Sequence, residues 1–385
     1  MTTDVQRLTI RNLGPIVEAD VEFGDLTVLV GPQATGKSIF LQMLKLVVDT
    51  PSIRKELSNF SIDWNDDLPA FLQAYLGEGM DSIISEDSML AVDGHARRLT
   101  AFARKQPGEE KAEQLFYIPA QRVLSMRDGM TRSFAEYRFG DPFCLREFSH
   151  KLHVLVQSEF IRGEFFPQSN RLKETLRNLV AERIYGDLKL VKDTTGYEKR
   201  IVLETGGGRS LPFLVWSAGQ REFTPLLLGF YWLLPPTRTS TRQSLRWAVI
   251  EEPEMGLHPA AISATMALVL ELLARGYKVC LTTHSPHVLD MVWALRFLQE
   301  NGGTLEDVKS LFSLSGPGAN LIAEPALEKV YRTYYFPREG LAQDISSLDP
   351  GDERSEVSGW GGLTGFSEHV AEVVSKVARR AERVA

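Results

Sequence analysis

The stretch that decides the fold is "GPQATGKS", from Gly31 to Ser38, which lies between the apolar run "LTVLV" and the segment "IFLQMLKLVV". These three pieces predict a strand, a tight glycine loop and a helix, and the loop matches the phosphate-binding pattern G-x-x-x-x-G-K-[ST]. In such a loop backbone N–H groups face the anion, and the N-terminus of the helix adds its positive end. The residues expected to bind the nucleotide are Gly31, Gln33, Ala34, Thr35, Gly36, Lys37 and Ser38.

The same pattern predicts the chemistry of the ligand. Lys37 would reach the β- and γ-phosphates of a nucleoside triphosphate, and Ser38 would bind Mg²⁺. ATP and Mg²⁺ are therefore the expected ligands. The alternative is a chance glycine turn, which the strand–loop–helix context disfavours.

Two acidic residues end an apolar strand in "RWAVIEEPEMGLHP". Strands that end at a phosphate site commonly carry the acidic residue that holds the metal. Glu251 stands in that place, and Glu252 follows it, where it could act on the attacking water as a general base. The alternative is an acidic cluster at a helix start that serves only the helix dipole.

Three further polar stretches stand at the ends of predicted elements: "WSAGQRE" with Ser217 and Glu222, "CLTTHSPHVLD" with His284, and "FYIPAQR" with Gln121. Taken singly, each has an ordinary explanation. Ser217 can cap a helix whose first turn contains Glu222, a lone histidine is more often structural than catalytic, and Gln121 fits a surface turn.

The order of these motifs resembles that of the ABC-type ATPases of the RecF, structural-maintenance-of-chromosomes (SMC) and OLD (overcoming lysogenization defect) group. "IEEPE…LHP" and "TTHSPHVL" look most like the OLD-like branch, whose members act in anti-phage defence. The resemblance covers roughly residues 5–45, 113–124 and 200–295. It implies an α/β ATPase head with a mixed central sheet flanked by helices. It also implies a homodimer, or a higher homo-oligomer of dimers, that sandwiches two nucleotides.

The resemblance also implies roles for the polar motifs on either side of the acidic strand. In this class the motif formed by Ser217, Gly219 and Gln220 caps the γ-phosphate that the opposite subunit binds. His284 matches the histidine that senses the γ-phosphate.

Two weaker correspondences complete the expected site. Gln121 would touch Mg²⁺ or the attacking water, a role for which Arg122 competes. Arg11 and Asn12 resemble an Arg-Asn pair that approaches the nucleotide in related repair ATPases.

The sequence departs from the family pattern in two places, the segment between Gln121 and Ser217 and the C-terminal tail. The gap of about ninety residues between Gln121 and Ser217 is broken by Gly and Pro and shows no sustained heptads, so we expect a short helical insertion without a long coiled coil. The tail "LDPGDERSE" lacks the strand-borne acids of the Toprim nuclease domain that OLD nucleases carry. We therefore expect ATP hydrolysis and no nuclease activity from this chain.

Composition sets broad limits on location and partners. The chain has 385 residues, 43% hydrophobic, a net charge of −7 and two cysteines, Cys144 and Cys280. With no apolar run long enough to span a bilayer and no signal core, we expect a reduced, cytoplasmic protein without membrane contact. The negative charge argues against a broad nucleic-acid surface but allows a local basic groove.

The expected organisation has four parts: residues 1–124 and 200–345 as the two portions of the ATPase head, 125–199 as a mainly helical insertion, and 346–385 as a loop with a C-terminal helix. Residues 39–105 are predicted to be mainly helical. The final helix carries Phe366, Val370, Val373, Val374 and Val377 on one face. Docking of this face on the body is the favoured interpretation, and a helix that docks a partner or contacts phosphate is the alternative.

Three functions remain open at this point. The favoured one is an ATPase that senses or clamps and signals to a separate effector protein, a nuclease or toxin, in anti-phage defence, with DNA or a phage protein as its trigger. The alternatives are a RecF-like clamp on DNA and an ATP-bound scaffold that hydrolyses slowly.

Overall fold

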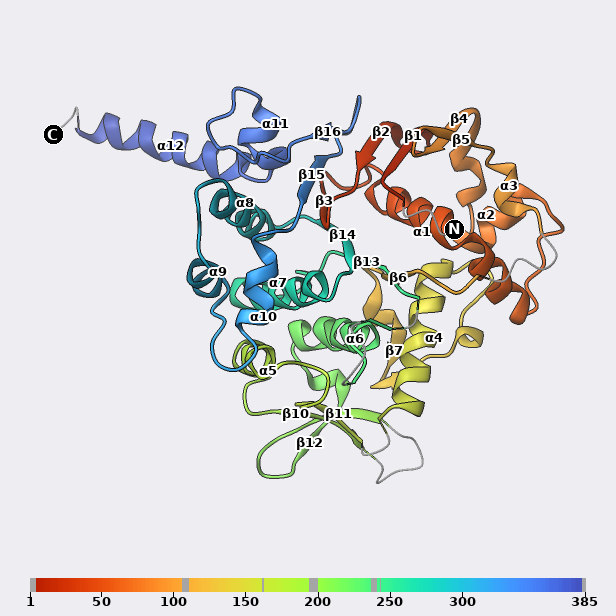
Figure 1. The fold of residues 1–385 in the computed structure, drawn as a ribbon, viewed down its shortest axis with the longest axis horizontal. Coiled ribbons are helices and arrows are strands. Elements are labelled where there is room, and N and C mark those ends of the chain that lie inside the picture. The colour runs from red at the N-terminus through yellow and green to blue at the C-terminus, as the bar shows by residue number, and fades with distance from the viewer. Residues whose placement is uncertain are drawn as a thin grey trace.

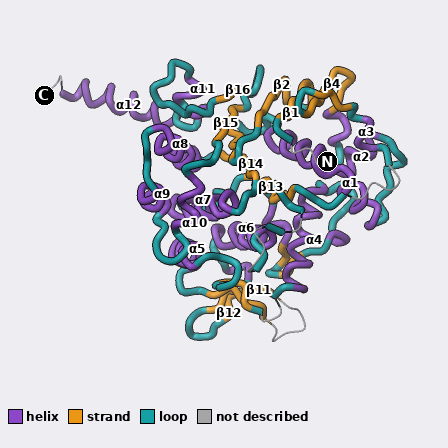
Figure 2. Tube along the Cα trace, viewed as in Figure 1, coloured by secondary structure: helices purple, strands orange, loops and turns teal. Residues whose placement is uncertain are grey.

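The computed structural model describes residues 5–105, 111–160, 163–193, 200–236, 241–242 and 244–382. Helices surround a central group of strands (Figures 1 and 2). This arrangement confirms the predicted α/β class. Within the described residues no helix is both long and apolar enough to cross a membrane.

A six-stranded sheet forms the centre of the molecule (Figure 1). Its strands follow the order β16 (Gln343–Asp344), β15 (Tyr331–Tyr335), β3 (Leu26–Val30), β14 (Lys278–Thr283), β13 (Trp247–Glu251) and β6 (Leu115–Ile118). From β15 to β6 neighbouring strands are parallel, and only β16 is antiparallel to its neighbour. β3, β13 and β6 are buried at every position, as parallel strands covered on both faces should be.

The two faces of this sheet are covered by different parts of the chain. Along β13, Ala248 and Ile250 join the core that contains the apolar residues of α6 and α7, whereas Trp247 and Val249 join the core beneath α1. The alternation follows from the two-residue period of a strand. The sheet is therefore the middle layer of the head, and its edges remain available for loops.

An antiparallel sheet near the N-terminus covers one side of α1. Its strands follow the order β2 (Ile16–Glu22), β1 (Arg7–Leu13), β4 (Ile84–Val92) and β5 (His95–Arg97). Between β2 and β4 the chain also forms β3, the helices α1 (Lys37–Asn59) and α2 (Leu68–Leu76) and the 3₁₀ segment η1 (Met80–Ile83), and α3 (Thr100–Ala103) follows β5. The prediction that residues 39–105 are mainly helical is thus wrong for β4 and β5. The first half of β4, "ISED", is polar and does not alternate like a strand. It forms a strand because it pairs with β1, which is distant in sequence.

The segment expected to be a helical insertion is more mixed. It holds α4 (Phe143–Ser158), α5 (Glu174–Val180) and the short helical segments η2 (Arg122–Ser125), η3 (Phe134–Glu136) and η4 (Ala181–Tyr185). It also holds the hairpin strands β7 (Met126–Arg127) and β8 (Met130–Thr131), together with β9 (Glu164–Phe166) and β10 (Lys189–Asp193). β10 pairs with β11 (Arg200–Glu204), which pairs with β12 (Ser210–Leu211). These antiparallel pairings form a small sheet, and the expected boundary at 199/200 falls between two of its paired strands.

The remaining helices pack along the other side of the sheet or extend from it. They are η5 (Phe213–Val215), α6 (Ala218–Leu233), α7 (Pro259–Ala274), α8 (Pro286–Glu300), α9 (Leu305–Phe312), α10 (Asn320–Ala326), α11 (Ser355–Ser358), η6 (Trp360–Gly362) and α12 (Gly365–Glu382). Among the described residues the longest helix is α1, with 23 residues. The expectation of a head without a long coiled coil is confirmed.

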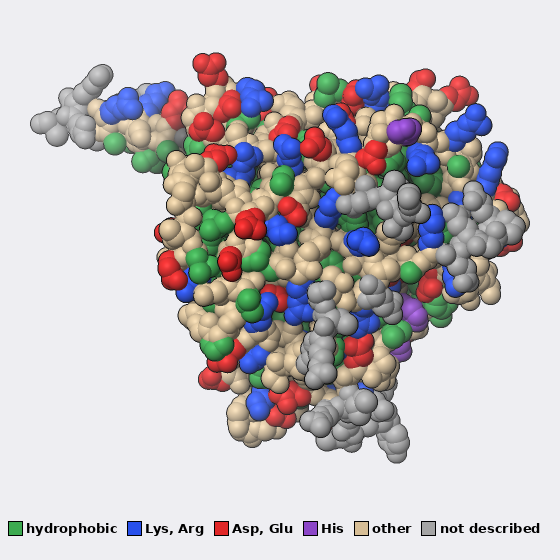
Figure 3. All heavy atoms as spheres, in the orientation of Figure 1, with side chains coloured by type: hydrophobic (Ala, Val, Ile, Leu, Met, Phe, Trp, Pro, Cys, Tyr) green, Lys and Arg blue, Asp and Glu red, His purple; other side chains and the backbone are tan. Residues whose placement is uncertain are grey.

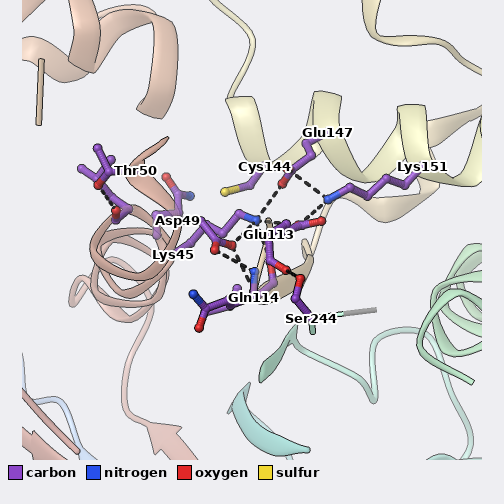
Figure 4. Close-up of polar contacts among 12 residues, drawn as sticks. Lys45, Asp49, Thr50, Glu113, Gln114, Cys144, Glu147, Lys151 and Ser244 are labelled. Atoms are coloured by element: carbon purple, nitrogen blue, oxygen red, sulfur yellow. Dashed lines mark hydrogen bonds and ion pairs between the residues drawn. The ribbon is translucent and has the colours of Figure 1, made fainter. Parts of the chain in front are cut away.

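A buried network of charges joins α1, α4 and the start of β6 (Figure 4). The Lys45 ammonium is fully buried and donates to Asp49 (2.8 Å), Glu113 (2.7 Å) and the carbonyl of Leu115 (2.6 Å). Burial alone would lower the pKa of Lys45, but the surrounding carboxylates outweigh it and hold this pKa well above its usual value. The cation therefore stays charged in the interior.

Two residues of α4 complete the network. Glu147 lies 3.2 Å from the Lys45 ammonium, and Lys151 pairs with both Glu113 and Glu147. Asp49 in turn accepts from the backbone N–H of Gln114 at 2.8 Å. The network thus fixes the α1 kink near Asp49 to the edge of the sheet.

The C-terminal helix α12 projects from the body (Figure 1). Its apolar side chains are exposed, with Phe366 at 79% and Val374 at 60%. Figure 3 shows Lys and Arg side chains along one side of this helix and hydrophobic side chains along the other. The favoured interpretation of a docked terminal helix is therefore wrong, because no part of the chain that the structure describes covers these apolar residues of α12.

Candidate nucleotide-binding site

Four neighbouring parallel strands end at one edge of the central sheet, and each leads into a motif singled out from the sequence. β3 leads into the glycine loop, β14 into His284, β13 ends at Glu251, and β6 leads into Gln121. In the sheet these strands are consecutive, in the order β3, β14, β13 and β6. Ligands of open α/β sheets bind at this carboxyl edge. The fold thus gathers residues that are up to about 250 positions apart in sequence at one edge.

The glycine loop has the backbone shape that anion binding requires. Gly36 caps α1 in a left-handed conformation, with φ of 91°, and a side chain there would place its Cβ 2.5 Å from Cγ1 of Ile16. Ala34 is also left-handed, with φ of 63°. Successive turns of this kind direct N–H groups inward. The loop is therefore built for close approach of a ligand to the backbone.

Lys37 lies folded against this loop. Its ammonium donates to the carbonyl oxygens of Gly31 (2.8 Å) and Pro32 (2.6 Å). Burial lowers the pKa of Lys37 to about 8, although Glu252 and Glu251 oppose the shift. A phosphate placed at the loop would stabilise the charged form of Lys37, which burial disfavours. Lys37 is thus placed to bind an anion at this position.

Glu251 has a buried carboxylate with spare coordination capacity. Its side chain accepts one hydrogen bond through Oε2, from the N–H of Ala120 at 3.1 Å. Its Oε1 is buried and has no hydrogen-bond partner among the described residues. Burial raises the pKa of Glu251, while the hydroxyl of Ser38, the Ala120 N–H and the Tyr117 hydroxyl oppose the shift. A buried carboxylate oxygen without a partner beside a serine hydroxyl suits a hard divalent cation, so these residues fit Mg²⁺.

Glu252 adopts a strained backbone conformation at the start of the turn that follows β13. Its φ is 43°, in the left-handed region that non-glycine residues rarely occupy. The strain is held by hydrogen bonds from the Glu252 N–H to the carbonyl (3.0 Å) and the hydroxyl (3.2 Å) of Thr282. The consequence is a side chain that turns away from the strand and remains 33% exposed.

His284 faces this carboxylate. Its Nε2 lies 3.7 Å from Oε1 of Glu252. Burial and the nearby Lys37 charge lower the pKa of His284, and Glu252 opposes the shift. The structure therefore brings the predicted general base and the predicted sensor histidine together.

Glu254 holds the His284 loop in place. Its Oε1 accepts from the Thr283 hydroxyl at 2.7 Å and from the backbone N–H of His284 at 2.8 Å. Its geometry makes it a brace for the loop after β14, a long-range role that the sequence does not signal.

Gln121 and Arg122 occupy different environments. Gln121 is exposed just beyond β6, whereas Arg122 is completely buried behind the acidic strand. Gln121 lies at the edge where the site is expected. Its contact with metal or water stays a prediction.

The S-x-G-Q motif begins α6. The Ser217 hydroxyl accepts from the N–H of Gln220 at 3.2 Å, and the Gln220 side chain accepts from the N–H of Ser217 at 3.1 Å. This capping box is the local explanation considered above. Gly219 has a second constraint, because an added Cβ would lie 3.0 Å from the carbonyl oxygen of Gly256. The motif therefore packs against the turn that follows Glu252.

Arg11 and Asn12 lie on the strand whose following turn touches the phosphate loop. Arg11 pairs with Glu18 at 2.7 Å, and Asn12 is left-handed with φ of 50°. Both precede Pro15 and Ile16, whose side chains pack against Gly36. Their contact with a nucleotide stays a prediction.

Parts of the chain are similar in sequence to known proteins. Residues 152–290 match the family described as "AAA domain, putative AbiEii toxin, Type IV TA system". The Old nuclease of Escherichia phage P2 is 27% identical over 107 residues, which make up 26% of this chain. The matched region spans 18% of the length of that curated relative.

Solved structures with similar folds include two SMC heads. One, titled as the SmcHead bound to the C-winged helix domain of ScpA, is 12% identical with a TM-score of 0.39, over 74% of this chain and 91% of the other. The SMC head domain from Thermotoga maritima is 12% identical with a TM-score of 0.33, over 75% of this chain and 92% of the other.

The family match and the Old nuclease relative confirm the recognition made from the sequence, an OLD- and SMC-like ABC-type ATPase.

Proposed function

We propose that this chain binds ATP with Mg²⁺ at the edge formed by β3, β14, β13 and β6 and hydrolyses it. One observation carries the proposal: four consecutive parallel strands deliver the phosphate loop, His284, the Glu251–Glu252 pair and Gln121 to the same edge. A glycine turn alone or an acidic cluster alone has an ordinary structural explanation. Neither helix capping nor core packing explains why both features lie at one edge together with a histidine whose Nε2 is 3.7 Å from Oε1 of Glu252.

Ser38 and Glu251 would hold the metal, with Gln121 at its edge. The unpaired buried Oε1 of Glu251 is the observation that supports this assignment. When bound, Mg²⁺ neutralises charge on the β- and γ-phosphates.

The protein's own residues divide the remaining work. Lys37 binds the phosphates, and Glu252 accepts a proton from the attacking water. His284, held by Glu254 through its backbone, contacts the γ-phosphate from the neighbouring strand. Water positioning is thus assigned to the Glu252–His284 pair.

We further propose that the active unit is a homodimer, or a higher assembly of such dimers, in which Ser217, Gly219 and Gln220 cap the nucleotide of the opposite subunit. Support comes from the surface beside the motif. Leu214 and Val215, on η5 just before Ser217, are 68% and 64% exposed. Apolar side chains so exposed next to a polar helix start are suited to an interface.

A mixed-dimer experiment tests this arrangement. Lys37→Ala and Gly219→Trp proteins, each inactive alone, are expected to regain partial ATP turnover when mixed and re-formed, because one of the two sites then has both halves intact. Steady-state phosphate release is the measurement. Absence of recovery despite proven subunit exchange would count against action in trans, and recovery without mixing would show that each chain works alone.

The proposal includes a separate effector, a nuclease or toxin, in cytoplasmic anti-phage defence, with DNA or a phage protein as trigger. It rests on the resemblance to OLD-like ATPases that are paired with a second protein and on the unmatched tail "LDPGDERSE". The Old nuclease relative is compatible with such a setting.

The purified chain is therefore expected to leave supercoiled DNA intact with Mg²⁺ or Mn²⁺. Gel conversion of supercoiled to nicked or linear DNA is the measurement, and the Lys37→Ala protein controls for contaminating nuclease. Robust metal-dependent cleavage that survives repurification would remove the need for a separate nuclease.

A further inference from the structure

Arg122 is a completely buried arginine that binds the backbone carbonyls of three residues in two separate segments. Its Nε donates to the carbonyl of Glu222 (3.2 Å), its Nη1 to that of Glu251 (2.9 Å) and its Nη2 to that of Glu252 (3.0 Å). The first carbonyl belongs to the first turns of α6, and the other two to the end of β13 and the residue after it. A planar guanidinium can bridge three acceptors in fixed geometry, which a lysine cannot do.

The guanidinium of an arginine stays protonated in proteins even where it is buried. A charged donor makes stronger hydrogen bonds to carbonyl oxygens than a neutral one. Arg122 is therefore a firm link between α6 and the acidic residues of the site.

The link bears directly on the orientation of Glu252. The carbonyl of Glu252 is held by Arg122 and its N–H by Thr282, so both sides of the strained residue are fixed. Releasing the carbonyl would allow φ to leave its value of 43° and the carboxylate to turn.

The other end of the link reaches the S-x-G-Q motif. Glu222 lies two residues after Gln220, and its side chain packs on the turn at Gly256, where an added Cβ would lie 3.1 Å from Cγ of Glu222. Gly219 contacts the carbonyl of the same turn. A shift of the first turn of α6 would therefore move the Glu222 carbonyl that Arg122 binds, and with it the guanidinium that holds Glu252.

We propose that Arg122 is a positioning residue that couples the first turn of α6 to Glu251 and Glu252, so that nucleotide contact at the S-x-G-Q motif and orientation of the general base change together. The proposal rests on the proposed function. It assigns the coupling between these two segments to Arg122, which binds the backbone carbonyls of both.

Arg146 is a matched control. It is also buried, at 1% exposure, and its Nη2 donates to a backbone carbonyl, that of Ala74, at 2.6 Å. It lies on α4 against α2, in elements that carry none of the proposed site residues. Substitutions of Arg146 therefore report the cost of removing a buried arginine without touching α6 or β13.

The experiment compares Arg122→Lys and Arg122→Met with Arg146→Lys and Arg146→Met. Hydrogen exchange is followed with and without Mg²⁺ and a non-hydrolysable ATP analogue, alongside kcat, KM and the folded fraction. In the wild type, nucleotide should slow exchange both in the phosphate loop and in residues 217–226. In Arg122→Lys the protection of the phosphate loop should remain, that of residues 217–226 should fall to the nucleotide-free level, and kcat should drop about tenfold with KM within about twofold.

Several results would overturn the inference. One is nucleotide protection of residues 217–226 that survives in Arg122→Lys; another is equal loss of kcat per folded molecule in the Arg122 and Arg146 variants. Protection of the phosphate loop alone in the wild type would also refute the coupling. A wild-type protein without any nucleotide protection would instead refute the proposed function itself, and with it this inference.

Discussion

Glu252→Gln is expected to lower kcat by about 10²–10⁴-fold while leaving the affinity for ATP with Mg²⁺ close to that of the wild type. Glutamine has nearly the same shape as glutamate but cannot accept the proton of the attacking water. Glu252 is placed for that role, because its left-handed backbone turns its side chain toward His284 at 3.7 Å. Single-turnover phosphate release together with equilibrium nucleotide binding separates the two effects.

Glu254→Gln is the matched control. Its remaining side-chain oxygen can still accept from the Thr283 hydroxyl and the His284 N–H, so the loop after β14 should keep its position. The loss of turnover should be much smaller than in Glu252→Gln. Wild-type turnover in Glu252→Gln would remove this residue from the mechanism and make Glu254 the next candidate base.

The same variant distinguishes two modes of signalling. Slow hydrolysis should accumulate the ATP-closed dimer. If closure is the signal, cells with Glu252→Gln should show a constantly active or trapped effector. We expect hydrolysis to be required, so that the variant is silent in a phage-challenge assay.

Lys37→Ala is expected to weaken ATP binding about tenfold or more. The ammonium provides charge-assisted hydrogen bonds to phosphate that contribute about 1.5–3 kcal/mol each, and about 1.4 kcal/mol corresponds to a tenfold change in Kd. In the structure this ammonium is satisfied by Gly31 and Pro32, so the residue is placed at the loop before any ligand arrives. Isothermal titration with ATP and Mg²⁺ gives the measurement.

Gln33→Ala serves as the control on the same loop. Its side chain is exposed, and the loop binds phosphate through backbone N–H groups that this change leaves in place. Its affinity should stay near that of the wild type. An unchanged affinity in Lys37→Ala would disprove the assignment of the loop.

The parts of the site that the sequence predicts are those with a local physical signature. The glycine loop needs Gly36 because of its left-handed backbone and its contact with Ile16. The apolar strand that ends in Glu251 is recognisable because a covered parallel strand has no polar alternation. These features depend on residues next to one another in the chain.

The remainder depends on contacts between distant segments. β4 becomes a strand through its pairing with β1, about eighty residues away, and its own polar sequence gives little sign of it. Arg122 and Glu254 acquire their roles only when β6, β13 and β14 lie side by side. The exposed valines of α12 show a further limit: an amphipathic pattern predicts a helix with an apolar face but does not say whether the same chain covers that face.

The buried network around Lys45 has a consequence for exchanging segments between relatives. Its three carboxylates and two ammonium groups come from α1, the start of β6 and α4, so no single contiguous segment carries the whole network. A chimera joined at residue 124 would bring Lys45, Asp49 and Glu113 from one parent and Glu147 and Lys151 from the other. An unmatched buried charge destabilises a protein by about 3–5 kcal/mol, a large fraction of the stability of an ordinary domain. The N-terminal part of this head and α4 should therefore be exchanged together in a chimera, although about a hundred residues separate Lys45 from Glu147 along the chain.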